Sequence, residues 1–422
     1  MTNHHQPRAH NRHPLPLDRR GFMLAGSSAA LGLTTLGLAS LGTAPARART
    51  TPALVPDEPF AAIPLGSPVT PPPAAEYVGM TFARPTTAPA RVRFTSAGTA
   101  SRWHAMGPSS HCPDSVPLGI STDLLRIPDG CTGIEVTHDD AAAGASAMTI
   151  SGGVRPIANA GNTTDFLGLP VITRPGWGAE TNLVESPWNR QYTAAQMITV
   201  HHSASAPWTT GPATVRAIYR YHAWMLGWGD VGYHLLIDPA GAVYAGRDTG
   251  SDSSPVFQPG TTNVVTAGHS YARNGGNIGI CVVGDYETQR PSAAAQRSLV
   301  TVLAALCQHL GLDPVSRLTY IEPDFGSRHT VPAIAQHRDL NDTSCPGDGF
   351  TAIFGALRAV VPTRMASRRA ASEDAAATDE QAAQALSPVE PANAAASGTA
   401  PAEIAPVELA TGEAGPGATP GA

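Results

Sequence analysis

The chain has 422 residues, of which 42% are hydrophobic and 14% charged, enough apolar residues for one large or two ordinary domains. This composition excludes a protein that is disordered throughout, although 42 glycines and 39 prolines indicate long irregular or linker segments. The formal net charge is -6, and the basic residues form no dense stripe. Nucleic acid is therefore not an expected partner.

The first segment has the pattern of an export signal. Arg19 and Arg20 precede Phe22 and a weakly apolar Gly/Ala/Leu run, which ends in an A-x-A sequence at Ala48. We predict a signal peptide of the twin-arginine type over residues 1–48, and hence an exported, secreted or cell-wall-associated protein. An ordinary secretory signal or an uncleaved anchor is the alternative.

Five cysteines in an exported chain leave at least one thiol without an intramolecular disulfide partner. Cys345 is the candidate for that thiol. Cys112 and Cys131 enclose a short loop-rich segment and are candidates for a disulfide. Cys281 lies in a predicted strand and Cys307 in a predicted helix. The sequence does not decide whether they are two free core thiols or form a second disulfide.

Residues 49–88 are rich in proline, which favours extended backbone, and we interpret them as a linker or a strap across a domain surface. Residues 89–165 contain short alternating runs such as ARVRFTS and GIEVTHDD, separated by Gly, Pro and Asp. This pattern predicts a small β-rich module.

From residue 171 strands alternate with helices. MITVHHS, YHLLIDPAGAVYAG and NIGICVVGDY predict a strand, a hairpin and a buried strand. TVRAIYRYHAWMLGW has one apolar helical face, and a second helix is predicted from a cap at Ser292 to a stop at Gly311. We therefore predict an α/β domain over residues 171–360, with a central mixed β-sheet flanked by helices.

Residues 363–422 are rich in Ala, Glu, Pro, Thr and Gly, with almost no aromatic residues. Such a segment cannot bury enough apolar surface to order itself, and a disordered acidic tail is predicted.

Few residues are candidates for metal chemistry. His201 and His202 end an apolar strand, and His337 and Cys345 lie in the polar segment AQHRDLNDTSCPGDGF. Catalytic zinc is usually held by three such side chains and keeps one position open. By chemistry alone, a zinc site and a set of surface residues are both compatible with this pattern.

Six motifs along the domain resemble those of one family. They are, in order, RPGWGAE, MITVHHSAS, GWGDVGYHLLID, AGAVYAGRD, AGHSYARNGGNIGICVVGDY and QHRDLNDTSCPG. Together they resemble the type 2 N-acetylmuramoyl-L-alanine amidases, the family shared by peptidoglycan recognition proteins and amidase-type phage lysozymes. The resemblance covers roughly residues 171–358.

The resemblance implies zinc as the cofactor, with His201, His337 and Cys345 as its ligands. It also implies that Tyr233 is the catalytic tyrosine, whose hydroxyl would bind the water or the oxyanion. Thr343 occupies a further catalytic position in the same pattern and would orient the water or the substrate. Cys345 matters most, because family members with another residue there act only as binders.

Three more residues match positions in the family's peptide groove: Arg247, His269 and Asn274. They would bind carboxylates or amides of the stem peptide. For Arg247, an ion pair with a nearby aspartate is an equally good interpretation.

The predicted function is zinc-dependent hydrolysis of the amide between N-acetylmuramic acid and L-alanine in peptidoglycan, through a metal-activated water. The alternative is a peptidoglycan-binding protein without activity. A zinc metalloprotease lacks support, since the chain has no H-E-x-x-H motif. The expected partner is peptidoglycan, through its stem peptide and muramic acid, with no stable membrane span after cleavage of the signal. The stem-peptide preference and the oligomeric state are not predicted.

Overall fold

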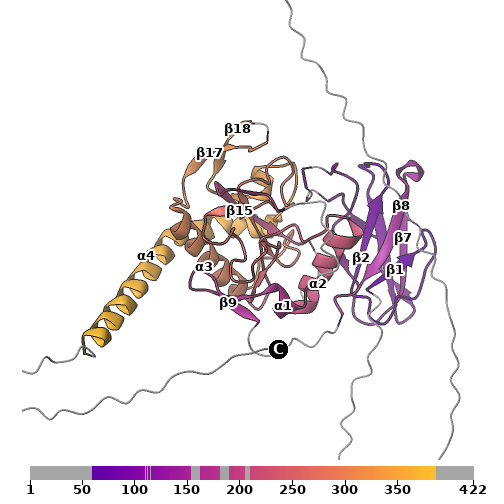
Figure 1. The fold of residues 1–422 in the computed structure, drawn as a ribbon. Helices are drawn as coiled ribbons and strands as arrows, with labels where there is room; N and C mark the ends of the chain where they lie inside the picture. Colours follow the sequence, from indigo (N-terminus) through magenta and orange to yellow (C-terminus); the bar gives the residue numbers. More distant parts are fainter. Residues whose placement is uncertain are drawn as a thin grey trace, which may run out of the picture. The chain divides into compact units, whose positions relative to one another are not determined.

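The computed structural model describes residues 59–109, 111, 113–114, 116–153, 162–180, 190–204, 210–324 and 326–385. The predicted signal peptide over 1–48 lies outside these residues. In the described part, an N-terminal set of strands is followed by a larger set of strands and helices (Figure 1). None of the helices in this part is both long enough and apolar enough to cross a membrane.

The N-terminal module consists of strands and one short 3-10 helix, η1 (Ala141–Ala143). Its strands are β1 (Phe60–Ile63), β2 (Tyr77–Phe82), β3 (Ala90–Ser96), β4 (Thr99–Ala100), β5 (His104–Met106), β6 (Leu125–Arg126), β7 (Cys131–His138) and β8 (Ala145–Ile150). One sheet has the order β1-β8-β2-β6, and in the other β3 pairs with β4, β5 and β7. Alternate side chains of both sheets, among them Met80, Val92 and Ile134, form a shared apolar core.

The module begins earlier than the sequence pattern indicates. Strands β1 and β2 lie inside the segment 49–88 that was predicted as a linker, and both pair antiparallel with β8. The prolines of this segment fall before, between and after the two strands but in neither of them, so β1 and β2 keep their backbone donors. Proline content therefore misplaced the boundary.

The α/β domain contains a seven-stranded mixed sheet in the order β19-β12-β16-β13-β14-β10-β9. These strands are β9 (Thr163–Asp165), β10 (Pro170–Ile172), β12 (Met197–His202), β13 (Leu235–Ile237), β14 (Val243–Ala245), β16 (Asn277–Val282) and β19 (Ile334–Gln336). Two further pairs are β11 (Tyr192–Ala194) with β15 (Asn263–Val265), and β17 (Arg317–Ile321) with β18 (Arg328–Pro332). The predicted mixed sheet and the β13–β14 hairpin are confirmed.

Helices cover both faces of this sheet. The helical elements are α1 (Arg174–Trp177), α2 (Pro212–Arg220), the π-turn η3 (Tyr221–Met225), α3 (Ala293–Leu310), the 3-10 turn η4 (His337–Asp339) and α4 (Asp348–Ala385). Successive side chains of a strand point to opposite faces. Accordingly, Ile280 packs with α3 and α4, whereas Cys281 packs with α2. Ser292 caps α3, and the helix ends at Gly311, as predicted.

Helix α4 changes the predicted end of the domain. It packs against α3 through Phe350, Phe354 and Val361, and it continues to Ala385 (Figure 1). The predicted start of a disordered tail at 363 is therefore wrong, because an Ala-rich segment with few glycines has high intrinsic helix propensity. Residues 386–422 lie outside the described part of the chain.

Two buried arginines of α2 connect the domain to the end of the N-terminal module. Arg216 donates to the carbonyl oxygens of Gly152 and Gly153, and to that of Trp177, each at 2.6 Å. Arg220 donates to the Ser151 carbonyl at 2.5 Å. These bonds are charge-assisted and shielded from water, so they hold the module firmly on α2.

The variant Arg216→Met tests this connection. Methionine keeps most of the apolar stem but leaves three buried carbonyls without their donor, and we expect a loss of about 3 kcal/mol in the free energy of unfolding. Denaturant unfolding of the full chain measures it. The control is Arg297→Met at an exposed position of α3, which should change stability by less than about 0.5 kcal/mol. Equal effects of both substitutions would contradict the assignment.

Candidate metal centre

Two parallel strands bring the first two predicted ligands together. Val200 of β12 pairs with Gln336 of β19, so the next residues, His201 and His337, fall side by side where the two strands end. Their ring centroids are 4.5 Å apart, and both side chains are fully buried. His201 lies on the face of the sheet that α2 covers, because Ile198 and Val200 point to the other face.

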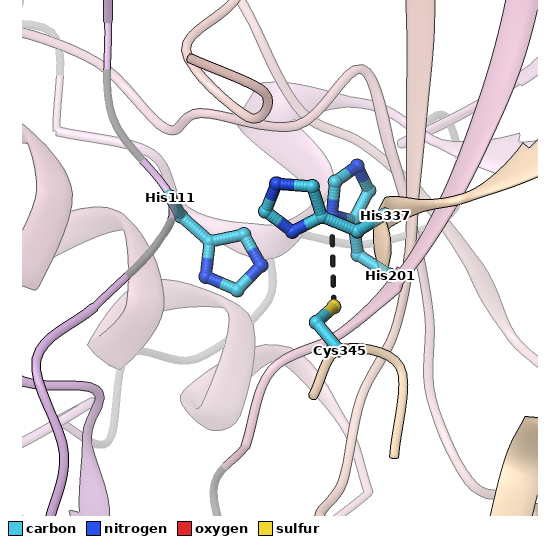
Figure 2. A group of neighbouring side chains, drawn as sticks. All are labelled: His111, His201, His337 and Cys345. Carbon is cyan, nitrogen blue, oxygen red and sulfur yellow. Dashed lines mark hydrogen bonds between the residues drawn. The ribbon is translucent and has the colours of Figure 1, made fainter. Parts of the chain in front are cut away.

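Cys345 comes from the loop after η4. Its carbonyl accepts from the Arg338 amide at 2.9 Å, and its own amide donates to the Thr343 hydroxyl at 3.1 Å. The loop is thereby folded back onto the turn that carries His337. The Sγ atom lies 3.8 Å from Nδ1 of His201 (Figure 2).

A fourth side chain joins the group. His111 lies in the loop between β5 and β6, and its ring centroid is 4.8 Å from that of His337. One potential ligand atom from each of His111, His201, His337 and Cys345 lies within 4.8 Å of the others. Figure 2 shows His111 approaching the other three from the N-terminal part of the chain.

The hydrogen-bond pattern around these donors fits a metal. Both ring nitrogens of His337 and Nε2 of His111 are buried and have no hydrogen-bond partner among the described residues. Buried polar atoms in proteins are almost always paired, and a bound metal ion would account for one unpaired lone pair on each of the two rings. In a tetrahedral zinc site, neighbouring donors lie roughly 3.3–3.8 Å apart. The separation of Cys345 Sγ and His201 Nδ1 falls at this spacing.

A hydrogen-bonded relay prepares His201 to bind a metal. His269 Nε2 lies 3.0 Å from the Asn277 carbonyl, and His269 Nδ1 lies 3.0 Å from His201 Nε2. A carbonyl only accepts, so His269 carries its proton on Nε2 and accepts on Nδ1. His201 then donates from Nε2, which leaves a lone pair on the Nδ1 atom that faces Cys345.

Glycine at position 279 makes room for this relay. A Cβ there would lie 2.5 Å from ring atoms of His269. Only glycine therefore lets the imidazole pack across β16.

Electrostatics favour neutral imidazoles in this group. Burial, followed by the neighbouring His337 and His269 rings, lowers the pKa of His201 well below its usual range. Burial and the ring of His111 do the same to the pKa of His337. Burial also raises the pKa of the Cys345 thiol, and a bound cation would oppose that effect by favouring the thiolate.

Tyr233 borders the same group, with its ring centroid 5.5 Å from that of His201. Burial raises the pKa of its hydroxyl well above the usual range, so the group remains a hydrogen-bond donor. A cavity of about 310 Å³ lies beside Cys345, and its lining includes Thr343, Asp123 and His202. His202 is not among the converging donors, since its Nδ1 accepts from the Tyr286 amide at 3.2 Å.

The residues predicted to contact substrate are all buried in this structure. Arg247 pairs with Asp230 at 2.9 Å, which is the ion-pair interpretation considered for it. His269 lies behind His201, in the relay. Asn274 accepts from the amides of His269 and Ser270 and donates to Asp114 of the N-terminal module. Because all three side chains are buried, the structure does not support their predicted contact with substrate.

The other cysteines in the described part of the chain do not join the metal group. Cys281 and Cys307 are free and buried, and Cys131 is free and partly buried. Cys112 lies outside the described residues, but the free thiol of Cys131 does not support the predicted disulfide between the two.

Sequence reasoning missed His111. This residue lies in a loop without periodicity, and its only local feature is the polar sequence HCPD. A search for histidines outside the six motifs would have raised it as a candidate.

Comparison with known proteins separates His111 from the other three donors. Residues 191–348 match the family model described as N-acetylmuramoyl-L-alanine amidase. His201, His337, Cys345 and Tyr233 lie inside this segment, and His111 lies outside it.

Relatives match less than half of the chain. The N-acetylmuramoyl-L-alanine amidase of Homo sapiens is 31% identical over 207 residues, which cover 46% of this chain and 29% of that protein. Peptidoglycan recognition protein 1 of Bos taurus is 27% identical over 184 residues, covering 42% of this chain and 78% of that protein. The chain thus spans less than a third of the human amidase. Among solved structures, the N-acetylmuramoyl-L-alanine amidase LysC from Clostridium intestinale is 20% identical, with a TM-score of 0.30 and coverage of 42% of this chain and 95% of that chain.

Substitution of His269 tests the relay. His269→Ala removes the acceptor that fixes the His201 tautomer, and we expect zinc affinity to fall about 10- to 100-fold. Competition with a chromophoric chelator measures it. The control His329→Ala, in β18, should leave the affinity unchanged. Unaltered zinc binding by His269→Ala would show that the relay does not prepare His201.

Proposed function

We propose that this chain is a zinc-dependent N-acetylmuramoyl-L-alanine amidase, which hydrolyses the amide between N-acetylmuramic acid and L-alanine in peptidoglycan. The observation that carries the proposal is the convergence of His201, His337 and Cys345, next to Tyr233, inside the segment that matches the amidase family model. Export of the chain, with residues 1–48 as its signal peptide, would bring it to this substrate.

The donor set suits zinc. Two imidazoles and one thiolate are typical zinc ligands, and sulfur disfavours magnesium and calcium. Bound zinc would polarise the amide carbonyl and make water a better nucleophile at neutral pH.

The residues of the chain supply the geometry for this chemistry. His269 holds the His201 ring so that Nδ1 points at the metal position, and Thr343 holds the backbone of Cys345. The Thr343 hydroxyl accepts from the Cys345 amide, which supports a positioning role for this residue. The predicted contact of Thr343 with water or substrate stays a proposal.

Tyr233 is the candidate oxyanion donor. Its pKa is raised by burial, so the hydroxyl keeps its proton and is able to donate to negative charge on the carbonyl oxygen. No covalent intermediate is needed, since water attacks the carbonyl carbon and the amine of L-alanine leaves with a proton.

The variant Cys345→Ser tests the metal and the reaction together. Loss of the thiolate should lower both bound zinc and the release of stem peptides from purified peptidoglycan by more than about 100-fold, beyond the loss expected for a hydrogen-bond partner of a ligand. Metal analysis and mass spectrometry of the products measure the two quantities. The matched control is Cys307→Ser, a buried thiol of α3 outside the metal group. Wild-type turnover by Cys345→Ser would exclude this site.

The variant Tyr233→Phe separates the chemistry from metal binding. Zinc content should stay at the wild-type level, while kcat falls about 100-fold through loss of one oxyanion donor. The control Tyr244→Phe removes a buried hydroxyl that is bonded to Asp238 rather than to the metal group. If Tyr233→Phe retains full kcat, the donor role is wrong. A protein that holds zinc and binds peptidoglycan but releases no product would instead be a binding protein.

A further inference from the structure

We propose that His111 of the N-terminal module is an internal fourth ligand, which closes the metal site and holds the amidase in a latent state. This inference rests on the proposed function, because it concerns access to the same metal. It adds a ligand from outside the segment that matches the amidase family model.

The orientation of His111 is that of a metal ligand. Its Nδ1 lies 3.5 Å from Oδ1 of Asp123, and its Nε2 is buried without a partner among the described residues. Histidines that bind metals usually present one nitrogen to the ion and the other to a carboxylate or carbonyl. With Asp123 on Nδ1, the free lone pair is on Nε2, the atom that faces His201 and His337 (Figure 2).

The number of donors distinguishes a closed site from an open one. Catalytic zinc has three protein ligands and one position for water, whereas four protein ligands complete a structural site. His201, His337 and Cys345 make three, and His111 makes four. No side chain of the four is more than 3% exposed. A polymeric substrate cannot reach a metal that is covered in this way.

The segment around His111 is anchored on both sides. Before His111, the Ser109 amide donates to the Ser121 carbonyl at 2.8 Å, within the module. After it, Asp114 accepts from the Ala272 amide at 2.7 Å and from the side chain of Asn274. The second anchor lies on the α/β domain, on the loop that follows His269.

These anchors explain how one loop controls the site. Asn274 binds the amides of His269 and Ser270 through its carbonyl oxygen, and Asp114 through its nitrogen. The loop that holds His111 over the metal is thus attached to the loop that orients His201. Withdrawal of His111 requires loss of the Asp114 contacts, and it would open the coordination position that water needs.

Cobalt substitution tests the coordination directly, without reference to turnover. Full-length wild type, His111→Ala and the control His104→Ala, from β5 of the same module, are loaded with Co²⁺, and visible absorption is recorded while azide is added. Four protein ligands leave no position for azide, so the wild-type and His104→Ala spectra should not change. The His111→Ala spectrum should shift on addition of azide, because one position is open.

Release of stem peptides from purified peptidoglycan is measured with the same proteins loaded with zinc. We expect His111→Ala to release stem peptides at least about 10-fold faster than wild type. The reason is that the closed state would dominate the wild-type population and would be absent from the variant. A second variant, Asp114→Ala, keeps all four ligands and weakens only the anchor. It should bind azide more weakly than His111→Ala and show an intermediate rate.

The outcomes distinguish this inference from the proposed function. A wild-type cobalt protein that binds azide as readily as His111→Ala overturns the fourth ligand, even if both release stem peptides. If His111→Ala does not fold, the cobalt forms of wild type and Asp114→Ala are compared instead. Azide binding by wild type as readily as by Asp114→Ala overturns the fourth ligand. Absence of hydrolysis by every zinc-loaded variant, together with the expected difference in azide binding, overturns the amidase function and leaves the fourth ligand standing.

Discussion

The parallel pairing of β12 with β19 is the constraint on which the rest of the centre depends. It sets His201 and His337 side by side, although they are far apart in the sequence. Parallel strands need a long crossover between them, and here the intervening chain supplies β13, β14, β16 and α3. A shift of one residue in this register would send one imidazole to the opposite face of the sheet. The apolar neighbours Ile198, Val200 and Ile334 prevent such a shift, since all three belong to the core beneath α3.

Burial of the centre has an energetic consequence. Each buried nitrogen without a partner costs about 1–3 kcal/mol, and His111 and His337 together bring three such atoms. A protein with no use for these lone pairs would replace them by apolar groups of similar shape. A metal would remove the cost for two of these three atoms, one on each ring, because a neutral imidazole has one lone pair and its other nitrogen carries the proton. Metal binding would therefore be coupled to folding, and the metal-free chain should be the less stable form.

The sequence predicted the parts of this structure that depend on local pattern. The strand MITVHH, the hairpin around Pro239 and the helix from Ser292 to Gly311 all follow from hydrophobic period and capping. The choice of His201, His337 and Cys345 needed the family resemblance, because each residue alone is unremarkable. For Arg247 the sequence left substrate contact and an ion pair equally open, and the structure shows its guanidinium paired with Asp230.

Other features could not be predicted because they arise from contacts between distant segments. Nothing in the segment around His111 indicates that it meets His201 and His337. The prolines around β1 and β2 made that segment resemble a linker. The alanine-rich composition of α4 is found in both disordered segments and helices, so it did not distinguish between them. In each case the composition indicated the local backbone preference but did not indicate which distant segment the residues would pack against.

Two of the attachments of the N-terminal module to the α/β domain differ in strength, and this difference locates the motion that would open the centre. Arg216 and Arg220 bind the end of the module through buried charge-assisted bonds, whose loss would leave several carbonyls unpaired. In the described part of the chain, the segment around His111 is held on the α/β domain by Asp114, which accepts from one amide and one side chain. Breaking the second attachment costs much less than breaking the first. Opening should therefore be a local withdrawal of the loop, with the module still docked on α2. In the proposed closed state, the firm attachment would keep His111 close to the metal position, so that the site would close again once the substrate had left.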